Sequence, residues 1–176
     1  MHFLALSGSL RAASTNTALL RAFARTASPL AEVTVFDGIA ALPAFSPDRE
    51  GDDTPTEVLT FAAAVSQADG LVISCPEYVH ALPGAFKNAI DWLVSRDELI
   101  AKPIALLHAS HRGEDVLADL RRVLATVSGR FAPDIFARFE LMKLDPDQVA
   151  LLMEDSANRD RLIAFTRRFA DFVAAG

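Results

Sequence analysis

The chain has 176 residues, of which 51% are hydrophobic and 23% are charged. This length and composition predict one globular domain over residues 1–176 and exclude a disordered chain. The formal net charge of −6 argues against a nucleic-acid partner, because that affinity depends on clustered lysine and arginine.

Compartment and membrane association follow from cysteine usage and apolar run lengths. The single cysteine, Cys75, excludes an internal disulfide and fits a reducing compartment. No run approaches the eighteen or so apolar residues of a membrane span, and the N-terminus lacks the basic region of a signal peptide. We therefore expect a cytoplasmic protein with no membrane partner, in which Cys75 is a buried, inert side chain.

Five apolar, strand-like runs alternate with helical patterns, which predicts a parallel sheet covered by helices on both faces. The first four strands are expected at 3–6, 32–36, 70–75 and 103–108. The fifth is expected within 131–141, from Ile135 onward, because Pro133 disfavours an earlier start. Apolar stripes predict helices over 19–27, 58–65, 86–94, 116–127 and 162–173.

Three of the helices have readable start signals. Thr54, Pro55 and Glu57 have the spacing of a capping box. Pro83 and Gly84 begin the helix expected over 86–94, and Asp145, Pro146 and Gln148 signal a further start. Between the second strand and Thr54, the connection 37–53 is long enough to be functional or mobile.

A small and polar turn, residues 7–17, joins the first strand to the first helix. Gly8 permits close backbone approach, Arg11 can form two charge-assisted bonds to a phosphate, and the helix N-terminus favours an anion. The spacing matches neither a Walker A motif nor a dinucleotide fingerprint, so a terminal phosphate monoester fits best. The alternative is an ordinary turn in which Ser and Thr side chains only cap the helix.

Two motifs, GSLRAASTN at 8–16 and PEYVHALPGAFKNAIDW at 76–92, resemble those of the NADPH-dependent FMN reductase family. Members of that family reduce flavins, quinones, azo dyes or chromate. The resemblance covers roughly the first 130 residues. It implies a flavodoxin-like, doubly wound α/β fold with a five-stranded parallel sheet of order 2-1-3-4-5. It also implies FMN, NADPH or NADH as cofactors, and a homodimer or homotetramer.

The resemblance also implies a set of cofactor-binding residues and no catalytic side chain or metal ligand. The family's phosphate-binding motif matches Ser9, Arg11, Ser14, Asn16 and Thr17, and its flavin-ring positions match Pro76, Glu77, Tyr78, His80 and Ser110. The competing interpretations are structural. Tyr78 can be a surface aromatic, Glu77 a cap of the helix that begins at Gly84 or a solvated charge, and His80 a polar turn residue.

The chain departs from the family pattern in two turns. Val79 stands where many members carry Asn, and Ala81 where they carry a small hydroxyl residue. His111 and Arg112 occupy a turn that is usually richer in glycine; Arg112 is compatible with neutralising the reduced flavin or a nicotinamide cofactor's phosphate. Polar positions on the helix at 84–94 are expected to be structural or at a subunit interface rather than catalytic; they are Asn88, Asp91 and Trp92.

Together these features predict an FMN-dependent NAD(P)H oxidoreductase that passes hydride through flavin to a small-molecule acceptor of quinone, azo, chromate or flavin type. Two other functions remain open: a flavodoxin-like electron carrier without NAD(P)H turnover, and a regulatory module for another phosphorylated ligand. Against the carrier, Arg11 is untypical of flavodoxins, and the chain has only one Trp and one Tyr to enclose a ring. No residue can be assigned to a choice between NADH and NADPH.

Overall fold

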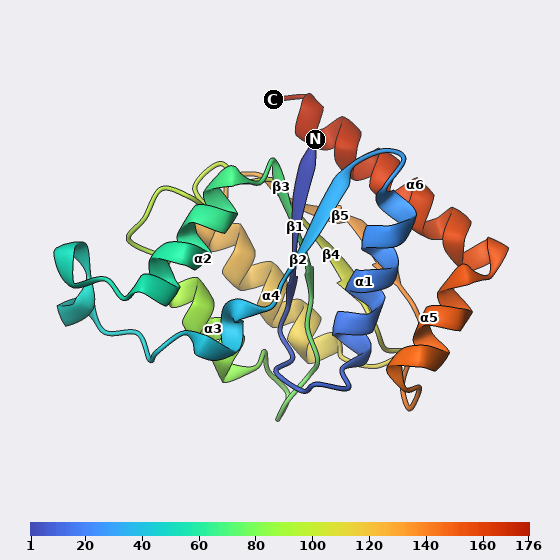
Figure 1. Ribbon diagram of the computed structural model, residues 1–176, viewed down its shortest axis with the longest axis horizontal. Coiled ribbons are helices and arrows are strands. Elements are labelled where there is room, and N and C mark those ends of the chain that lie inside the picture. Colours follow the sequence, from blue (N-terminus) through green and yellow to red (C-terminus); the bar gives the residue numbers. More distant parts are fainter.

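The computed structural model describes all 176 residues and contains one five-stranded parallel sheet (Figure 1). The strand order is β2-β1-β3-β4-β5, which confirms the predicted flavodoxin-like order. The strands are β1 (His2–Ser7), β2 (Glu32–Phe36), β3 (Gly70–Ser74), β4 (Ile104–His108) and β5 (Phe131–Arg138). The first four agree with the predicted ranges to within one residue at each end.

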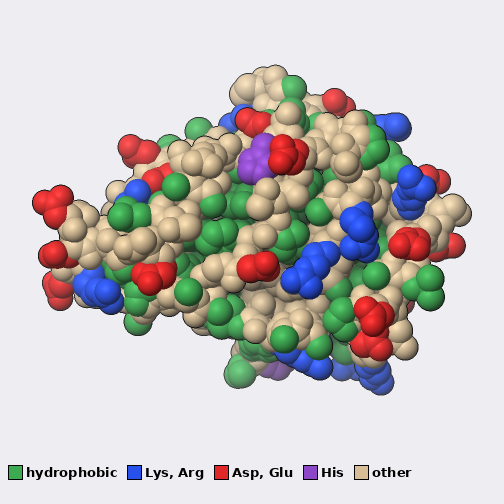
Figure 2. Space-filling view, in the orientation of Figure 1, with side chains coloured by type: hydrophobic (Ala, Val, Ile, Leu, Met, Phe, Trp, Pro, Cys, Tyr) green, Lys and Arg blue, Asp and Glu red, His purple; other side chains and the backbone are tan.

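Helices cover both faces of the sheet, as the alternating pattern predicts. On one face lie α1 (Thr15–Ala27), α5 (Pro146–Glu154) and α6 (Ser156–Ala174), and on the other α2 (Thr56–Gln67), α3 (Gly84–Asp91) and α4 (Glu114–Val127) (Figure 1). None of these helices has both the length and the apolar character needed to cross a membrane. On the face shown in Figure 2, acidic and basic side chains are interspersed and form no continuous basic stripe.

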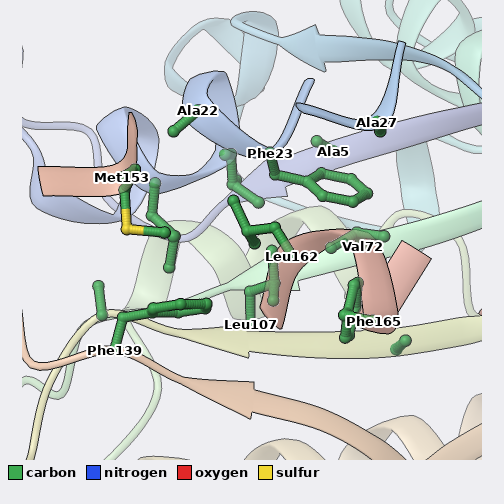
Figure 3. Packing of buried hydrophobic residues seen from close by; sticks show 14 of the residues in the cluster. Ala5, Ala22, Phe23, Ala27, Val72, Leu107, Phe139, Met153, Leu162 and Phe165 are labelled. Carbon is green, nitrogen blue, oxygen red and sulfur yellow. The ribbon is translucent and has the colours of Figure 1, made fainter. Parts of the chain in front are cut away.

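Successive strand residues point to opposite helical layers, so the core consists of two clusters of similar size, 22 and 21 buried residues. Phe3 belongs to the α1, α5 and α6 side, whereas its neighbour Leu4 belongs to the α2, α3 and α4 side. Figure 3 shows the first cluster, in which Phe23 meets Phe165 edge to face at 5.7 Å. Burial on both faces explains why the central strands are nearly continuous apolar runs.

The predicted start of the fifth strand was wrong. β5 begins at Phe131 and runs through Pro133, because it is an edge strand whose register against β4 is irregular at this point. Partners change from Ile104↔Phe131 to Leu106↔Phe136, so an extra stretch of β5 bulges outward and leaves Pro133 exposed. A bulged edge is where proline is tolerated in a strand.

The predicted capping box at Thr54 was also wrong. Helix α2 starts at Thr56 with Pro55 as its N-cap, and the Thr54 hydroxyl donates to the Gly51 carbonyl at 2.8 Å. Thr54 therefore closes the short 3-10 turn before the helix rather than capping the helix itself. The signal at Asp145 was correct: its carboxylate accepts from the Gln148 N–H at 2.8 Å, and the Gln148 side chain accepts from the Asp145 N–H.

Helix α3 is shorter than its apolar stripe predicts. It ends at Asp91, and the backbone continues in tight turns in which the Leu93 N–H donates to the Ile90 carbonyl. The last predicted member of the stripe, Val94, is therefore 60% exposed, whereas Leu93 is buried.

The polar residues of the α3 segment hold the long connection before α2, which extends beyond α2 and α3 (Figure 1). Asn88 accepts from the Phe45 N–H at 2.8 Å and donates to the Pro43 carbonyl at 2.9 Å. Buried Trp92 donates to the same carbonyl at 2.8 Å and packs edge-on against Phe45. Asn88 and Trp92 thus have structural roles, as expected, and Asp91 pairs with Lys87.

Candidate cofactor-binding site

Strands β1, β3 and β4 end at one edge of the sheet, and the turns that follow them converge there. Ser7 lies opposite Ser74, and the Gly8 N–H donates to the Ser74 carbonyl at 2.9 Å. A cavity of about 260 Å³ opens between these turns. Its lining consists of Thr15, Asn16, Cys75, Pro76, Glu77, His108, Ala109, Ser110, Arg112, Gly113 and Met142. This position is where open parallel sheets bind ligands.

A larger hollow of about 410 Å³ lies between α1 and the α5–α6 region. It is lined mainly by charged and polar side chains, among them Arg25, Glu154 and Arg159. No turn at the carboxyl end of a strand reaches it, so the smaller cavity is the candidate site.

Serine hydroxyls organise the turn after β1. The Ser7 hydroxyl accepts from the Thr17 hydroxyl at 2.9 Å and from the Ser9 N–H at 3.2 Å. Ser14 caps α1 by accepting from the Thr17 N–H at 3.2 Å. The backbone N–H groups of residues 12–16 make no hydrogen bond within the protein. They form, with the positive end of the α1 dipole, a concentration of free donors suited to an anion.

Arg11 is exposed and its guanidinium has no hydrogen bond or ion pair within the chain. It is therefore available to an anionic ligand without first breaking an internal contact.

Gly8 is required by close packing, because a Cβ there would lie 2.1 Å from the Cys75 sulfur. Cys75 itself is buried, as expected for a packing residue, and burial raises the pKa of its thiol far above the ordinary range.

A buried polar contact joins the first and second of the converging turns. The Ser74 hydroxyl donates to Asn16 Oδ1 at 2.8 Å, and both residues are buried. This contact orients the Asn16 amide, whose nitrogen makes no hydrogen bond within the chain. Asn16 lines the cavity, so the amide is a donor available to a ligand.

The turn after β3 is a two-residue reverse turn closed by Tyr78 and Ala81, whose backbones exchange hydrogen bonds of 3.0 and 3.1 Å. Its two central residues, Val79 and His80, both have positive φ, 52° and 59°. Such values are rare outside glycine and asparagine and are strained for a β-branched side chain. Val79 is 95% exposed, and no contact compensates this strain. Without Gly or Asn, the sequence carries no signal for this turn.

Two side chains of this turn hold it against the start of α4. Glu77 Oε2 accepts from the Val116 N–H at 3.1 Å, and His80 Nδ1 pairs with Asp115 Oδ2 at 2.6 Å. Glu77 therefore caps α4, not the helix that begins at Gly84, because the two turns converge in space. The hydrogen bond to Asp115, with the charges of Asp115 and Glu77, raises the pKa of His80.

Glu77 and His80 form a cluster with Asp115, in which the possible metal-ligand atoms all lie within 4.8 Å of one another. His80 was expected to have no convergent metal ligand, and the structure brings two carboxylates to it. Each member already has a protein partner, Glu77 through Val116 and His80 through Asp115. The arrangement is explained by docking of the turn onto α4, with no metal needed.

His108, at the end of β4, is a site residue that the sequence interpretation missed. It is 2% exposed, lines the cavity, and its Nε2 hydrogen-bonds to the Arg112 carbonyl. Gly113, with φ of 101°, permits this packing, since a Cβ there would lie 2.8 Å from the imidazole ring. Burial lowers the pKa of His108. The available signal was a polar residue ending an apolar strand, a feature it shares with Ser7 and Ser74.

The predicted site residues fall into two groups. Asn16, Pro76, Glu77 and Ser110 line the cavity, whereas Ser9, Arg11, Ser14, Thr17, Tyr78 and His80 lie in the adjoining turns. Thr17 has both of its donors engaged, with Ser7 and Ser14. Of the two residues without an assigned role, Arg112 lines the cavity and His111 does not. Contacts of all these residues with a cofactor stay predictions.

Fold and site together define a doubly wound α/β protein of flavodoxin-like order with its candidate ligand cavity at the topological switch point between β1 and β3. The family model for NADPH-dependent FMN reductase matches residues 1–140. The chain belongs to this family and is an oxidoreductase, and the family's chemistry depends on FMN and NAD(P)H.

Individual relatives agree with this assignment. A quinone reductase of Escherichia coli K12 is 30% identical over 176 aligned positions, covering 96% of this chain and 93% of that protein. A subunit of the NADH:(hydroxy)cinnamate reductase of Vibrio ruber is 36% identical over 112 residues, 63% of this chain and 54% of the subunit. Among solved structures, the flavoenzyme NAD(P)H:(acceptor) oxidoreductase FerB of Paracoccus denitrificans has the same fold, with a TM-score of 0.76, 23% identity, and coverage of 99% and 97%.

Proposed function

We propose that this protein is an FMN-dependent NAD(P)H reductase of small-molecule acceptors of the quinone, azo or flavin type, with chromate as a further acceptor. One observation carries the proposal: three turns meet around a cavity beside a helix N-terminus with free N–H groups and an unpaired arginine. That combination suits a planar, apolar ring joined to a phosphate. The quinone reductase name of the Escherichia coli relative supports the choice of acceptor.

In this proposal the turn after β1 holds the phosphate. Arg11 supplies a full positive charge, Ser9 and Ser14 supply hydroxyl donors, and the N–H groups of residues 12–16 supply backbone donors. Asn16 lies between the phosphate turn and the cavity, and its free amide nitrogen points to a role toward the ribityl chain. Thr17 acts through Ser7, which keeps the turn in place.

The turns after β3 and β4 frame the ring. Pro76 and the reverse turn form one side of the cavity, and Ser110 and Arg112 line the other. FMN, when bound there, supplies the acceptor and donor of hydride. The protein's residues orient the ring and, through Arg112, offer a positive charge where the reduced cofactor is negative.

The scarcity of tryptophan and tyrosine favours an enzyme over an electron carrier. Trp92, the sole tryptophan, is buried against Phe45 beneath the long connection, so it is not available to cover a ring. Tyr78 is the sole tyrosine and is 50% exposed in its turn. A ring held beside Tyr78 alone keeps one face accessible, which is what nicotinamide and acceptor both require.

An absorption spectrum tests the proposal. Protein supplied with FMN and freed of excess should show the bound flavin's visible bands, lose them under anaerobic NADPH or NADH, and regain them when a quinone is added. Protein that binds no FMN under these conditions would contradict the proposal. A spectrum that responds to dithionite but to neither nicotinamide cofactor would point to the electron carrier instead.

The proposal extends to assembly and location. We propose a homodimer or homotetramer, as the family resemblance implies, and a cytoplasmic location, which fits the single cysteine. Light scattering after gel filtration measures the assembly. A mass near the monomer's 19.0 kDa at micromolar concentration would contradict the oligomer.

A further inference from the structure

One of the residues that line the cavity has a buried hydrogen-bond acceptor without a donor. His108 is 2% exposed, and its Nδ1 is buried and has no hydrogen-bond partner in the protein. The other ring nitrogen, Nε2, contacts the Arg112 carbonyl. A carbonyl oxygen can only accept, so Nε2 carries the proton of the neutral ring and Nδ1 presents its lone pair.

The surroundings of His108 keep the ring neutral. Burial is the largest influence and lowers the pKa, and the charge of Arg138 on β5 acts in the same direction. The Arg112 carbonyl, Glu114 at the start of α4 and Glu77 in the turn after β3 oppose this shift without reversing it. At neutral pH the side chain is therefore an acceptor at Nδ1 and a donor at Nε2.

The fold holds this ring in place. Gly113 adopts a left-handed conformation directly against it, and any side chain at that position would collide with the imidazole. Buried acceptors are almost always partnered in folded proteins, so an unpaired one on a residue that lines the cavity points to a ligand donor. An apolar residue would fill the same space without this need.

We propose that His108 Nδ1 accepts a hydrogen bond from bound FMN, which makes His108 a cofactor-positioning residue. FMN offers two kinds of donor, the N3–H of the ring and the hydroxyls of the ribityl chain. This inference rests on the proposed function, because it names a contact within the FMN site. It also gives a role to the last residue of β4, which the family motifs do not cover.

Two variants of His108 distinguish the hydrogen bond at Nδ1 from the one at Nε2. In His108→Gln the amide nitrogen replaces Nε2 and keeps the bond to the Arg112 carbonyl, but no acceptor remains at Nδ1. In His108→Asn an acceptor oxygen lies near Nδ1. We expect His108→Gln to weaken FMN binding by roughly 5- to 15-fold and His108→Asn by less, measured by flavin fluorescence titration. His111→Gln, an exposed neighbour, is the control and should bind FMN as the wild type does.

Imidazole ¹⁵N NMR of the wild-type protein gives a readout that does not depend on a variant folding. The protonated Nε2 signal should be present without FMN, and FMN should shift the Nδ1 signal upfield as it accepts a hydrogen bond. The same titration with 3-methyl-FMN identifies the donor: loss of the shift assigns N3–H, and its persistence assigns a ribityl hydroxyl.

The failures of the two proposals are distinguishable. If the protein binds no FMN, the proposed function fails. If it binds FMN but His108→Gln leaves the dissociation constant unchanged and the Nδ1 signal does not move, the function stands and the His108 contact is wrong.

Discussion

At the residue scale, Arg11 gives the sharpest test of the phosphate turn. Its guanidinium has no partner in the chain, so its replacement removes ligand contacts without breaking internal ones. Arg11→Ala should weaken FMN binding by about 10- to 100-fold, the value of one or two charge-assisted hydrogen bonds, and leave riboflavin binding nearly unchanged. Arg25→Ala, in the last turn of α1 and far from the phosphate turn, is the control. Equal losses for FMN and riboflavin would show that Arg11 does not contact the phosphate.

The pairing of His80 with Asp115 should make the stability of the fold depend on pH. The hydrogen bond to Asp115 raises the pKa of His80 above the ordinary value of 6.5, so the folded state binds the proton more tightly than the unfolded state. The resulting stabilisation is present in full below pH 6.5 and is lost as the pH rises through the folded-state pKa. His80→Gln should therefore be less stable than the wild type at pH 5.5, with a gap that narrows toward pH 8.5, measured by urea unfolding.

The pKa of His108 is shifted in the opposite direction, so its effect on the pH dependence of folding stability has the opposite sign. Its pKa is lowered, so its contribution is present above pH 6.5 and is lost as the pH falls. This contribution is common to the wild type and His80→Gln and cancels in their difference. A gap that widened with rising pH would contradict the assignment of the His80 pair.

At the element scale, the reverse turn after β3 is the strained part of the site. Asparagine tolerates positive φ far better than valine, so Val79→Asn should stabilise the protein by about 1 kcal/mol in denaturant unfolding. Val79→Thr retains the β-branch and should give no such gain. Equal effects of the two substitutions would show that the backbone at this position is not strained.

Elements were predictable where local pattern decides the outcome. The apolar runs and the cap at Asp145 depend on neighbouring residues alone, and both predictions were confirmed. Thr54 has a similar signature, but its hydroxyl bonds backward to Gly51, which no local pattern reveals. The cap that Glu77 provides for α4 was unpredictable for the same reason: it joins turns that are 39 residues apart in sequence.

At the scale of the whole molecule, the strand order brings separate turns to one edge of the sheet. The family resemblance covered the first and second turns, whereas in the third turn it matched Ser110 but assigned no role to His108 or Arg112. The role proposed for His108 depends on its burial and on its contact with the Arg112 carbonyl, and no local sequence pattern reveals either. The architecture was therefore readable from the sequence, and the polar detail of the cavity was not.

The central claim is that this cavity holds FMN and supports turnover with NAD(P)H. The most direct measurement is steady-state oxidation of NADPH by FMN-loaded protein, with and without 1,4-benzoquinone. The account predicts quinone-dependent NADPH consumption that is proportional to protein concentration and well above the rate with the same concentration of free FMN. A loaded protein whose rate equals that free-FMN background would contradict it.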